Sequence, residues 1–418
     1  MAKIGHHVIG IDVDAAKIQQ LSEGRAPFFE PELPEILVEA GAVGVLSFTT
    51  DVAQSADATV HFIAVGTPQS KEGQAADLSF VNAAVDGLLP YLKPGDLVVG
   101  KSTVPVGTAA RLAERVESTG ATLVWNPEFL REGFAVKDTI TPDRLVYGVP
   151  EGETGERAAK ILDEVYAQTI AADTPRIVTD LATAELVKVA ANAFLATKIS
   201  FINAMAEIAE VVGADVTQLA DAIGLDERIG RRFLGAGIGF GGGCLPKDIR
   251  AFAARAEELG RGSSVAFLHD VDAINLRRRD RAVALTLEAL GGSAIGKKIA
   301  ILGAAFKPCS DDIRDSPALD VAVRLHGLGA NVTVTDPQAL ENARRVHPQL
   351  DYSDSVEEAL RDADAVVLVT EWDEYRHELD PYWAASLVRC PSIVDGRNCL
   401  EPQSWRAAGW NYRGMGRP

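Results

Sequence analysis

The sequence predicts an α/β protein in which two doubly wound domains are joined by a helical central domain with one long helix. In the first third of the chain, short β-branched runs alternate with amphipathic helical stretches, a rhythm typical of βαβ units in a parallel sheet. Residues 181–212 then carry many good helix formers and no strand pattern. A second βα series begins at residue 298. These observations predict a Rossmann-like domain at each end of the chain.

The first domain is predicted over residues 1–175. We expect its buried strands at residues 7–12, 59–65 and 97–101. Amphipathic patterns predict its helices at residues 31–40, 78–91, 108–118 and 156–168.

The central helical domain is predicted over residues 176–292 and the second doubly wound domain over residues 293–418. A glycine-rich loop at 235–243 interrupts the central helices, and small residues at 291–296 predict a linker. Strands of the last domain are expected at residues 298–303, 331–336, 365–370 and 392–395.

Composition limits the function classes. With 59 acidic and 41 basic residues the formal net charge is −18, which argues against a general nucleic-acid surface. The four cysteines have neither metal-ligand nor disulfide-framework spacing, so we expect no metal site. No run of 18 apolar residues and no signal-peptide pattern is visible. We therefore expect a cytoplasmic protein.

Asp12 ends the first predicted strand, where an acidic residue can accept hydrogen bonds from an adenosine ribose and so favour NAD over NADP. The alternative is that this aspartate caps a helix beginning near Asp14. From the feature alone, both interpretations stay open.

Such an acid normally follows a glycine-rich phosphate loop by about 20 residues. Only 11 residues precede Asp12, and they contain no such loop. The pattern Gly237, Gly239 and Gly242 lies among predicted helices and follows no strand, so we interpret it as a coincidental match. We expect the first strand and the phosphate loop to be absent, with loss of a pyrophosphate-binding helix N-terminus and an uncovered sheet edge.

Six glycines fall between Gly235 and Gly243, immediately before Cys244. Glycine allows the backbone to approach a ligand closely. A thiol becomes a useful nucleophile when positive charge or a helix N-terminus favours its thiolate form, and both Lys247 and the helix predicted after Pro246 offer this. Asp248 adds a potential base. A buried structural cysteine is the alternative, but the glycines before the cysteine and the Pro-Lys-Asp residues after it favour a nucleophile.

Lys188 and Asn192 are four residues apart on the predicted long helix, so both side chains lie on one face. An ammonium and a carboxamide together suit a developing oxyanion. A solvated lysine beside a mid-helix asparagine is the simpler alternative.

Two further segments follow predicted strands, where α/β folds place their ligands. Asn126-Pro-Glu-Phe-Leu-Arg-Glu132 contains Glu128, a potential general base, although a surface turn explains it equally well. Lys101-Ser-Thr-Val-Pro-Val-Gly107 offers two hydroxyl groups.

Together these segments resemble the UDP-glucose/GDP-mannose dehydrogenase family over nearly the whole chain. The motifs that carry the resemblance are Gly66-Thr-Pro68, Lys101-Ser-Thr-Val-Pro105, Asn126-Pro-Glu-Phe-Leu130, Lys188-Val-Ala-Ala-Asn192, Gly239-Phe-Gly-Gly-Gly-Cys-Leu-Pro-Lys-Asp248, Ala305-Phe-Lys307, Arg314 and Asp395-Gly-Arg397. The absent phosphate loop is the main departure from the family pattern.

The resemblance implies an NAD-dependent enzyme that oxidises C6 of a nucleotide sugar twice, from alcohol to acid. Cys244 would form a thiohemiacetal with the intermediate aldehyde and then a thioester, which water hydrolyses. Lys188 and Asn192 would stabilise oxyanions, and Glu128 would act as acid/base in hydrolysis. Thr103 and Asp248 would position a water that helps to remove the hydroxyl proton.

The resemblance also implies the binding residues. For NAD these are Asp12, Lys17, Thr67, Thr103, Glu132, Lys247 and Arg314. For the nucleotide sugar they are Glu128, Phe129, Leu130, Arg131, Glu132, Lys188, Asn192, Arg228, Phe233, Leu234, Gly235, Ala236, Gly237, Gly241, Lys307 and Arg397. Arg228 would reach across from a second subunit, which implies a homodimer formed through the central helix.

Three functional interpretations remain. Residues 227–234 are most similar to the branch that oxidises UDP-glucose to UDP-glucuronate, while other members of the family act on GDP-mannose or UDP-N-acetylhexosamines. A non-catalytic remnant that binds a nucleotide sugar is favoured by the missing phosphate loop. A two-electron sugar dehydrogenase would need no cysteine.

Overall fold

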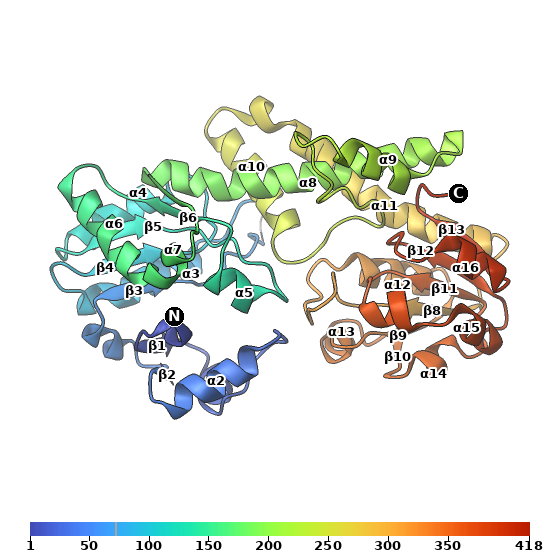
Figure 1. Cartoon of the computed structure of the whole chain (residues 1–418), viewed down its shortest axis with the longest axis horizontal. Helices are drawn as coiled ribbons and strands as arrows, with labels where there is room; N and C mark the ends of the chain where they lie inside the picture. Colours follow the sequence, from blue (N-terminus) through green and yellow to red (C-terminus); the bar gives the residue numbers. More distant parts are fainter. Residues whose placement is uncertain (72) are drawn as a thin grey trace. The chain divides into compact units, whose positions relative to one another are not determined.

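The computed structural model describes residues 1–71 and 73–418. The chain forms two compact units (Figure 1). The first contains residues 1–191 and 250–262, and the second contains residues 192–249 and 263–418.

The first unit is built on a five-stranded sheet. Its strand order is β3 (Val60–Ile63), β4 (Leu97–Gly100), β5 (Thr122–Trp125), β6 (Leu145–Gly148) and β7 (Arg176–Thr179). All neighbouring pairs are parallel except β5 and β6. β4 and β6 are buried along their whole length, which is why they are continuous apolar runs without alternation.

Helices cover both faces of this sheet. Val98 packs in one cluster with α3 (Ser79–Leu88) and α4 (Thr108–Glu117), while Leu97 and Val99 pack in a second cluster with α6 (Glu153–Val165). Successive side chains of β4 thus serve opposite cores, as a doubly wound fold requires. The unit also contains α5 (Ala135–Ile140) and α7 (Ala167–Ala171).

A separate two-stranded sheet lies near the N-terminus. β1 (Val8–Ile11) and β2 (Leu46–Thr49) pair in parallel and accompany α1 (Ala15–Ser22) and α2 (Leu33–Ala42). Among residues 1–71 and 73–418, no strand joins this pair to β3. More than a third of the surface of Ile9 and Ile11 is exposed. The absence of a phosphate loop stays a prediction.

One long helix, α8 (Leu181–Val212), contributes to both units. Its 32 residues extend about 48 Å at the usual rise per residue. In the first unit the buried Glu185 carboxylate accepts hydrogen bonds from Gly107 N at 2.7 Å and Ala109 N at 2.6 Å. These N–H groups lie at the start of α4, so the carboxylate caps that helix from α8.

Within the described part of the chain, α8 is the one helix long and apolar enough to cross a membrane by length and composition. Nearly half of the relevant window is buried inside the protein. The helix also carries the buried polar residues Glu185, Asn192 and Asn203, which fits a helix packed within a folded core.

The second unit contains a six-stranded parallel sheet. Its order is β10 (Asp351–Tyr352), β9 (Asn331–Thr335), β8 (Lys298–Leu302), β11 (Ala365–Leu368), β12 (Ser392–Asp395) and β13 (Asn411–Gly414). The central strand β8 comes first in sequence, and the order reverses beside it, which is the arrangement of a Rossmann fold. The predicted second doubly wound sheet is therefore confirmed.

Helices complete the second unit. Around its sheet lie α12 (Pro317–Gly327), α13 (Leu340–Val346), α14 (Val356–Leu360), α15 (Pro381–Leu387) and α16 (Pro402–Ala407). The predicted helical middle of the chain consists of α8, α9 (Val216–Gly224), α10 (Leu245–Glu258) and α11 (Phe267–Ala289).

The Glu185 cap gives a stability prediction. Glu185→Ala leaves two N–H groups of α4 without their acceptor, so the first unit should lose about 2–4 kcal/mol of unfolding free energy. Differential scanning calorimetry should show its transition at a lower temperature. Glu114→Ala, at an exposed position on α4, is the matched control and should leave the transition unchanged. Equal effects of the two substitutions would contradict the capping role.

Candidate active site

The glycine-rich loop lies between α9 and α10, and Cys244 immediately precedes α10. The thiol is exposed, and the cysteines of the described chain form no disulfide. Gly239 has a φ of 91°, and a Cβ there would lie 2.2 Å from Asn275 Oδ1. A Cβ at Gly241 would lie 2.2 Å from Asp315 O. Glycine is required at both positions because other groups occupy the space of a side chain.

Side chains from α11 and α8 bind the backbone of this loop. The buried Asn275 accepts a hydrogen bond from Phe240 N at 2.7 Å and donates one to Phe240 O at 2.9 Å. Asn203 accepts from Gly237 N at 2.9 Å, and Arg278 Nε donates to Gly237 O at 3.1 Å. The conformation of the loop therefore depends on these partners rather than on its own side chains.

Arg397, predicted to bind the nucleotide sugar, also holds this loop. Its guanidinium donates to Gly239 O at 2.8 Å, to Val369 O at 2.8 Å and to Phe306 O at 3.0 Å. It also forms an ion pair with Glu371 at 3.1 Å. The structure thus gives Arg397 a supporting role, and substrate binding by it stays a prediction.

The second unit brings Asn192, Lys247 and Asp248 together. The buried Asp248 accepts hydrogen bonds from Asn192 Nδ2 and Lys247 Nζ, both at 2.6 Å. A carboxamide has two N–H donors, so the bond to Asp248 fixes the Asn192 amide and leaves one donor for a developing oxyanion. Asn192 is therefore a held, buried donor rather than a solvated mid-helix asparagine.

Lys188 lies one turn before Asn192 on α8 and is partly buried. Its ammonium lies 5.4 Å from the centre of the Phe129 ring, over which the Arg144 guanidinium also lies at 4.0 Å. A cation at this distance is attracted by the ring. The structure therefore brings Lys188 to the 126–132 segment.

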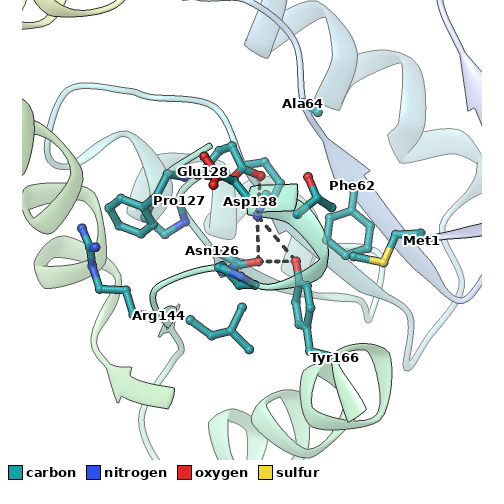
Figure 2. Close-up of a pocket in the computed structure, with 14 residues that line it drawn as sticks. Met1, Phe62, Ala64, Asn126, Pro127, Glu128, Asp138, Arg144 and Tyr166 are labelled. Atoms are coloured by element: carbon teal, nitrogen blue, oxygen red, sulfur yellow. Dashed lines mark hydrogen bonds and ion pairs between the residues drawn. The ribbon is translucent and has the colours of Figure 1, made fainter. Parts of the chain in front are cut away.

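The 126–132 segment follows β5, and its residues 126–129 line a pocket of about 190 Å³ in the first unit (Figure 2). Glu128 Oε1 accepts hydrogen bonds from Phe129 N at 2.8 Å and Leu130 N at 3.0 Å. Its second oxygen, Oε2, lies 3.0 Å from Lys101 Nζ. The carboxylate is therefore held through both of its oxygens.

A second ion pair braces the same segment. Arg131 forms a two-pronged contact with Asp138, at 2.8 Å from Nε and 2.7 Å from Nη2, and its backbone N–H binds the same carboxylate at 2.9 Å. Hydrogen bonds from Arg131 lower the pKa of Asp138. This contact occupies the Arg131 side chain, which was predicted to bind substrate.

The residues at the cofactor end fit the ribose part of NAD. Asp12 follows β1, and its carboxylate accepts from Asp14 N at 3.0 Å and from Lys17 Nζ at 2.7 Å. Asp14, not Asp12, caps α1 by accepting from Ala16 N and Lys17 N. This removes the capping alternative for Asp12 and leaves its half-exposed carboxylate in place for a ribose hydroxyl.

The start of α1 follows Asp12 and is capped by the Asp14 carboxylate, so α1 is distinct from the pyrophosphate-binding helix, whose N-terminus is predicted to be lost with the phosphate loop. Thr67 Oγ1 donates to Thr103 O at 2.8 Å, which joins the segments after β3 and β4. In the part of the chain that the structure describes, no cluster of three potential metal ligands occurs.

Several of the other predicted binding residues belong to the glycine-rich loop or contact it, as Arg314 does by accepting a hydrogen bond from Gly242 N at 2.9 Å. Leu234 and Ala236 are buried, while Phe233 is 41% exposed and has a φ of 65°. Arg228 is almost fully exposed and pairs with Asp226 at 2.6 Å. The remaining four lie as follows: Lys307 over the Phe306 ring, Arg314 paired with Asp312, Glu132 partly buried, and Gly235 exposed.

Sequence reasoning missed the residues that support these groups. The sequence gives Lys101 no role beyond its place in a motif, and no pattern identifies Asn203, Asn275, Arg278 or Tyr166. Their partners lie about 25 to 65 residues away along the chain, as for Asn203 with Gly237 and Lys101 with Tyr166. A buried asparagine contact of this kind has no local sequence signal.

Replacing Asn275 tests the support of the cysteine loop. Asn275→Leu preserves the size of the side chain but leaves Phe240 N–H and C=O without partners, which should cost about 2–4 kcal/mol of stability. The midpoint temperature of thermal denaturation of the second unit should fall, and the turnover rate should fall with it. Arg277→Ala, which removes an exposed ion pair on the same helix, should change stability by less than about 1 kcal/mol. An unchanged melting curve for Asn275→Leu would contradict this account.

Comparisons with known proteins cover the whole chain. Residues 1–170 match the NAD binding domain of the UDP-glucose/GDP-mannose dehydrogenase family, residues 182–277 its central domain and residues 300–402 its UDP binding domain. The predicted domain boundaries themselves stay predictions.

Individual relatives are consistent with this family match. The chain is 42% identical to the UDP-glucose 6-dehydrogenase of Rhizobium meliloti and 41% identical to TuaD of Bacillus subtilis, covering all of this chain and 95% and 89% of theirs. A UDP-glucose dehydrogenase structure from Pyrobaculum islandicum matches with a TM-score of 0.90 at 39% identity, covering 100% of this chain and 94% of that one. The chain belongs to the UDP-glucose/GDP-mannose dehydrogenase family.

Proposed function

We propose that this protein is an NAD-dependent UDP-glucose 6-dehydrogenase, which oxidises the C6 hydroxyl of UDP-glucose to the carboxylate of UDP-glucuronate. The arrangement of Cys244 at the start of α10, beside the Asn192–Asp248 pair, carries the proposal. The names of the relatives with about 40% identity support UDP-glucose as substrate, and the matched UDP binding domain supports a UDP-sugar. We also assign the protein to the cytoplasm.

In the first oxidation, a water held by Thr103 and Asp248 takes up the proton of the C6 hydroxyl. Bound NAD⁺ supplies the hydride acceptor for each oxidation. The Cys244 thiolate then adds to the aldehyde carbon, and Asn192 and Lys188 stabilise the oxyanion that develops.

After the second hydride leaves, the sugar is held as a thioester on Cys244. Water attacks the thioester carbon while Glu128 accepts its proton. The carbon–sulfur bond breaks, the thiolate is restored and the carboxylate leaves. Covalent capture thus retains the reactive aldehyde between the two oxidations.

The cofactor assignment combines residues that follow strands with residues on helices and loops. We assign NAD binding to Asp12, Lys17, Thr67, Thr103, Glu132, Lys247 and Arg314. The Asp12 carboxylate, at the end of β1 and free of a capping role, supports preference for NAD, since it would repel a 2′-phosphate. We assign the other residues that the sequence predicts for the nucleotide sugar to binding of UDP-glucose.

A homodimer through α8 completes the proposal. Phe194, Phe201 and Ile208 are 67%, 49% and 56% exposed and follow one another at intervals of seven residues. Val211, 86% exposed, extends the same face. An apolar heptad stripe of this kind is typical of a helix that packs against another helix, and the exposed Arg228 is suited to reach a second subunit.

The dimer can be tested at this stripe. Phe201→Glu places charges in the interface of both subunits, so sedimentation velocity should shift from twice the 44.5 kDa chain mass to the monomer. Ile295→Glu, at a 78% exposed position in a loop, is the matched control and should stay dimeric. A monomeric wild-type protein, or a dimeric Phe201→Glu, would refute this interface.

The reaction can be tested by stoichiometry. The purified chain should form two NADH for each UDP-glucose consumed. Cys244→Ala should form no more than one and reduce carboxylate production by at least about 1,000-fold. Cys390→Ala, at another exposed cysteine, should keep full activity. Binding of UDP-glucose without any NADH formation would favour a second candidate, a non-catalytic nucleotide-sugar-binding protein, which the predicted absence of the phosphate loop favours.

A further inference from the structure

Lys101 directly follows β4 and lines the pocket of the first unit. Only 15% of its side chain is exposed. Its ammonium lies 3.0 Å from Glu128 Oε2, 3.2 Å from Asn126 Oδ1 and 3.5 Å from the Tyr166 hydroxyl. An ammonium has three N–H donors, so these three oxygens define its position.

The groups beneath Lys101 are themselves fixed. The buried Asn126 donates from Nδ2 to Val146 O at 2.9 Å, on β6. The Tyr166 hydroxyl donates to Asn126 Oδ1 at 2.7 Å. The dashed lines in Figure 2 show that Asn126, Tyr166 and the ammonium form one connected network. Lys101 is therefore hydrogen-bonded to neighbours whose positions are fixed by β5, β6 and the end of α6.

Keeping a lysine in this place is unfavourable without an anionic partner. Burial removes water from the ammonium and lowers the pKa of Lys101, and Glu128 opposes this effect. The pair joins a fixed cation to a carboxylate that is still 34% exposed. Because the two neighbouring backbone N–H groups hold Oε1, the contact with Lys101 determines the direction of Oε2.

A purely structural brace for the loop is the competing explanation. However, the loop is already fixed at both ends without Lys101. Asn126 binds Val146 at one end, and Arg131 binds Asp138 through three hydrogen bonds at the other. The contact from Lys101 acts on the carboxylate between these two fixed points.

We infer that Lys101 is a positioning residue, which orients the Glu128 carboxylate toward the water that hydrolyses the thioester on Cys244. The inference rests on the proposed function. In the step concerned, the water oxygen bonds to the thioester carbon, its proton passes to Glu128, and the electron pair of the carbon–sulfur bond returns to the thiolate. Lys101 itself gains and loses no proton.

The test is a rapid-mixing experiment on the full-length enzyme with UDP-glucose and excess NAD⁺. Lys101→Met should give a burst of two NADH per active site and then a steady state slower by about tenfold or more. Intact mass spectrometry of quenched samples should show an acyl adduct on Cys244. The kcat/KM for UDP-glucose should change by less than about twofold, because hydrolysis follows binding and both oxidations. Lys101→Arg should recover part of the rate.

Two controls separate positioning from bracing. Asp138→Asn weakens the loop brace and should raise the KM for UDP-glucose without accumulation of the adduct. Tyr166→Phe removes one support of the ammonium and should accumulate the adduct to a smaller extent. If Lys101→Met does not fold, Tyr166→Phe decides the question, and absence of its adduct overturns the inference.

Glu128→Gln distinguishes failure of the inference from failure of the proposed function. If Glu128→Gln accumulates the adduct and Lys101→Met does not, Lys101 has no positioning role and the proposed function stands. If wild-type enzyme turns over and Glu128→Gln hydrolyses the thioester at the wild-type rate, the proposed role of Glu128 is wrong and the inference fails with it.

Discussion

The backbone of residues 235–243 is the constraint on which the second unit depends. Glycine residues cannot contribute side-chain contacts, yet their buried peptide groups need hydrogen-bond partners. Asn203, Asn275, Arg278 and Arg397 supply these partners from α8, α11 and the segment after β12. The buried Arg278 also forms an ion pair with Glu210 of α8 at 3.7 Å, which partly compensates its charge.

Both units hold their candidate reactive groups in the same manner. Asp248 fixes the Asn192 amide in the second unit, and Lys101 fixes the Glu128 carboxylate in the first. In each case a buried charged side chain determines the direction of a more versatile polar group. The geometry of the proposed site is thus set by pairs of side chains that hold each other in place.

The sequence predicts local features well. The βα rhythm located the buried strands because each is a short apolar run, and α8 was visible as an unbroken helical pattern. The parallel strand β7 begins at Arg176, just after the expected end of the first domain, and its first three residues are exposed, so it lacks the apolar signal of a core strand. Asp14 rather than Asp12 caps α1, a distinction that depends on backbone angles.

Contacts between distant elements could not be predicted. The Asn275–Phe240 contact joins residues 35 positions apart, and Lys101 meets Tyr166 across 65 positions. Neither of these sequence separations recurs along the chain, so the hydrophobic periodicity gives no information about these two contacts. Arg397 was expected at the substrate from its motif, but its geometry with three backbone carbonyls appears only in the folded chain.

The division of the first unit's strands into two sheets affects colloidal behaviour. The edge of a parallel sheet presents rows of N–H and C=O groups that can pair with another chain, and β1 adds the half-exposed Ile9 and Ile11. Mutual repulsion from a net charge of −18 keeps such edges apart at neutral pH. Toward the isoelectric point near 4.9 that repulsion vanishes, so net charge no longer opposes pairing between exposed strand edges.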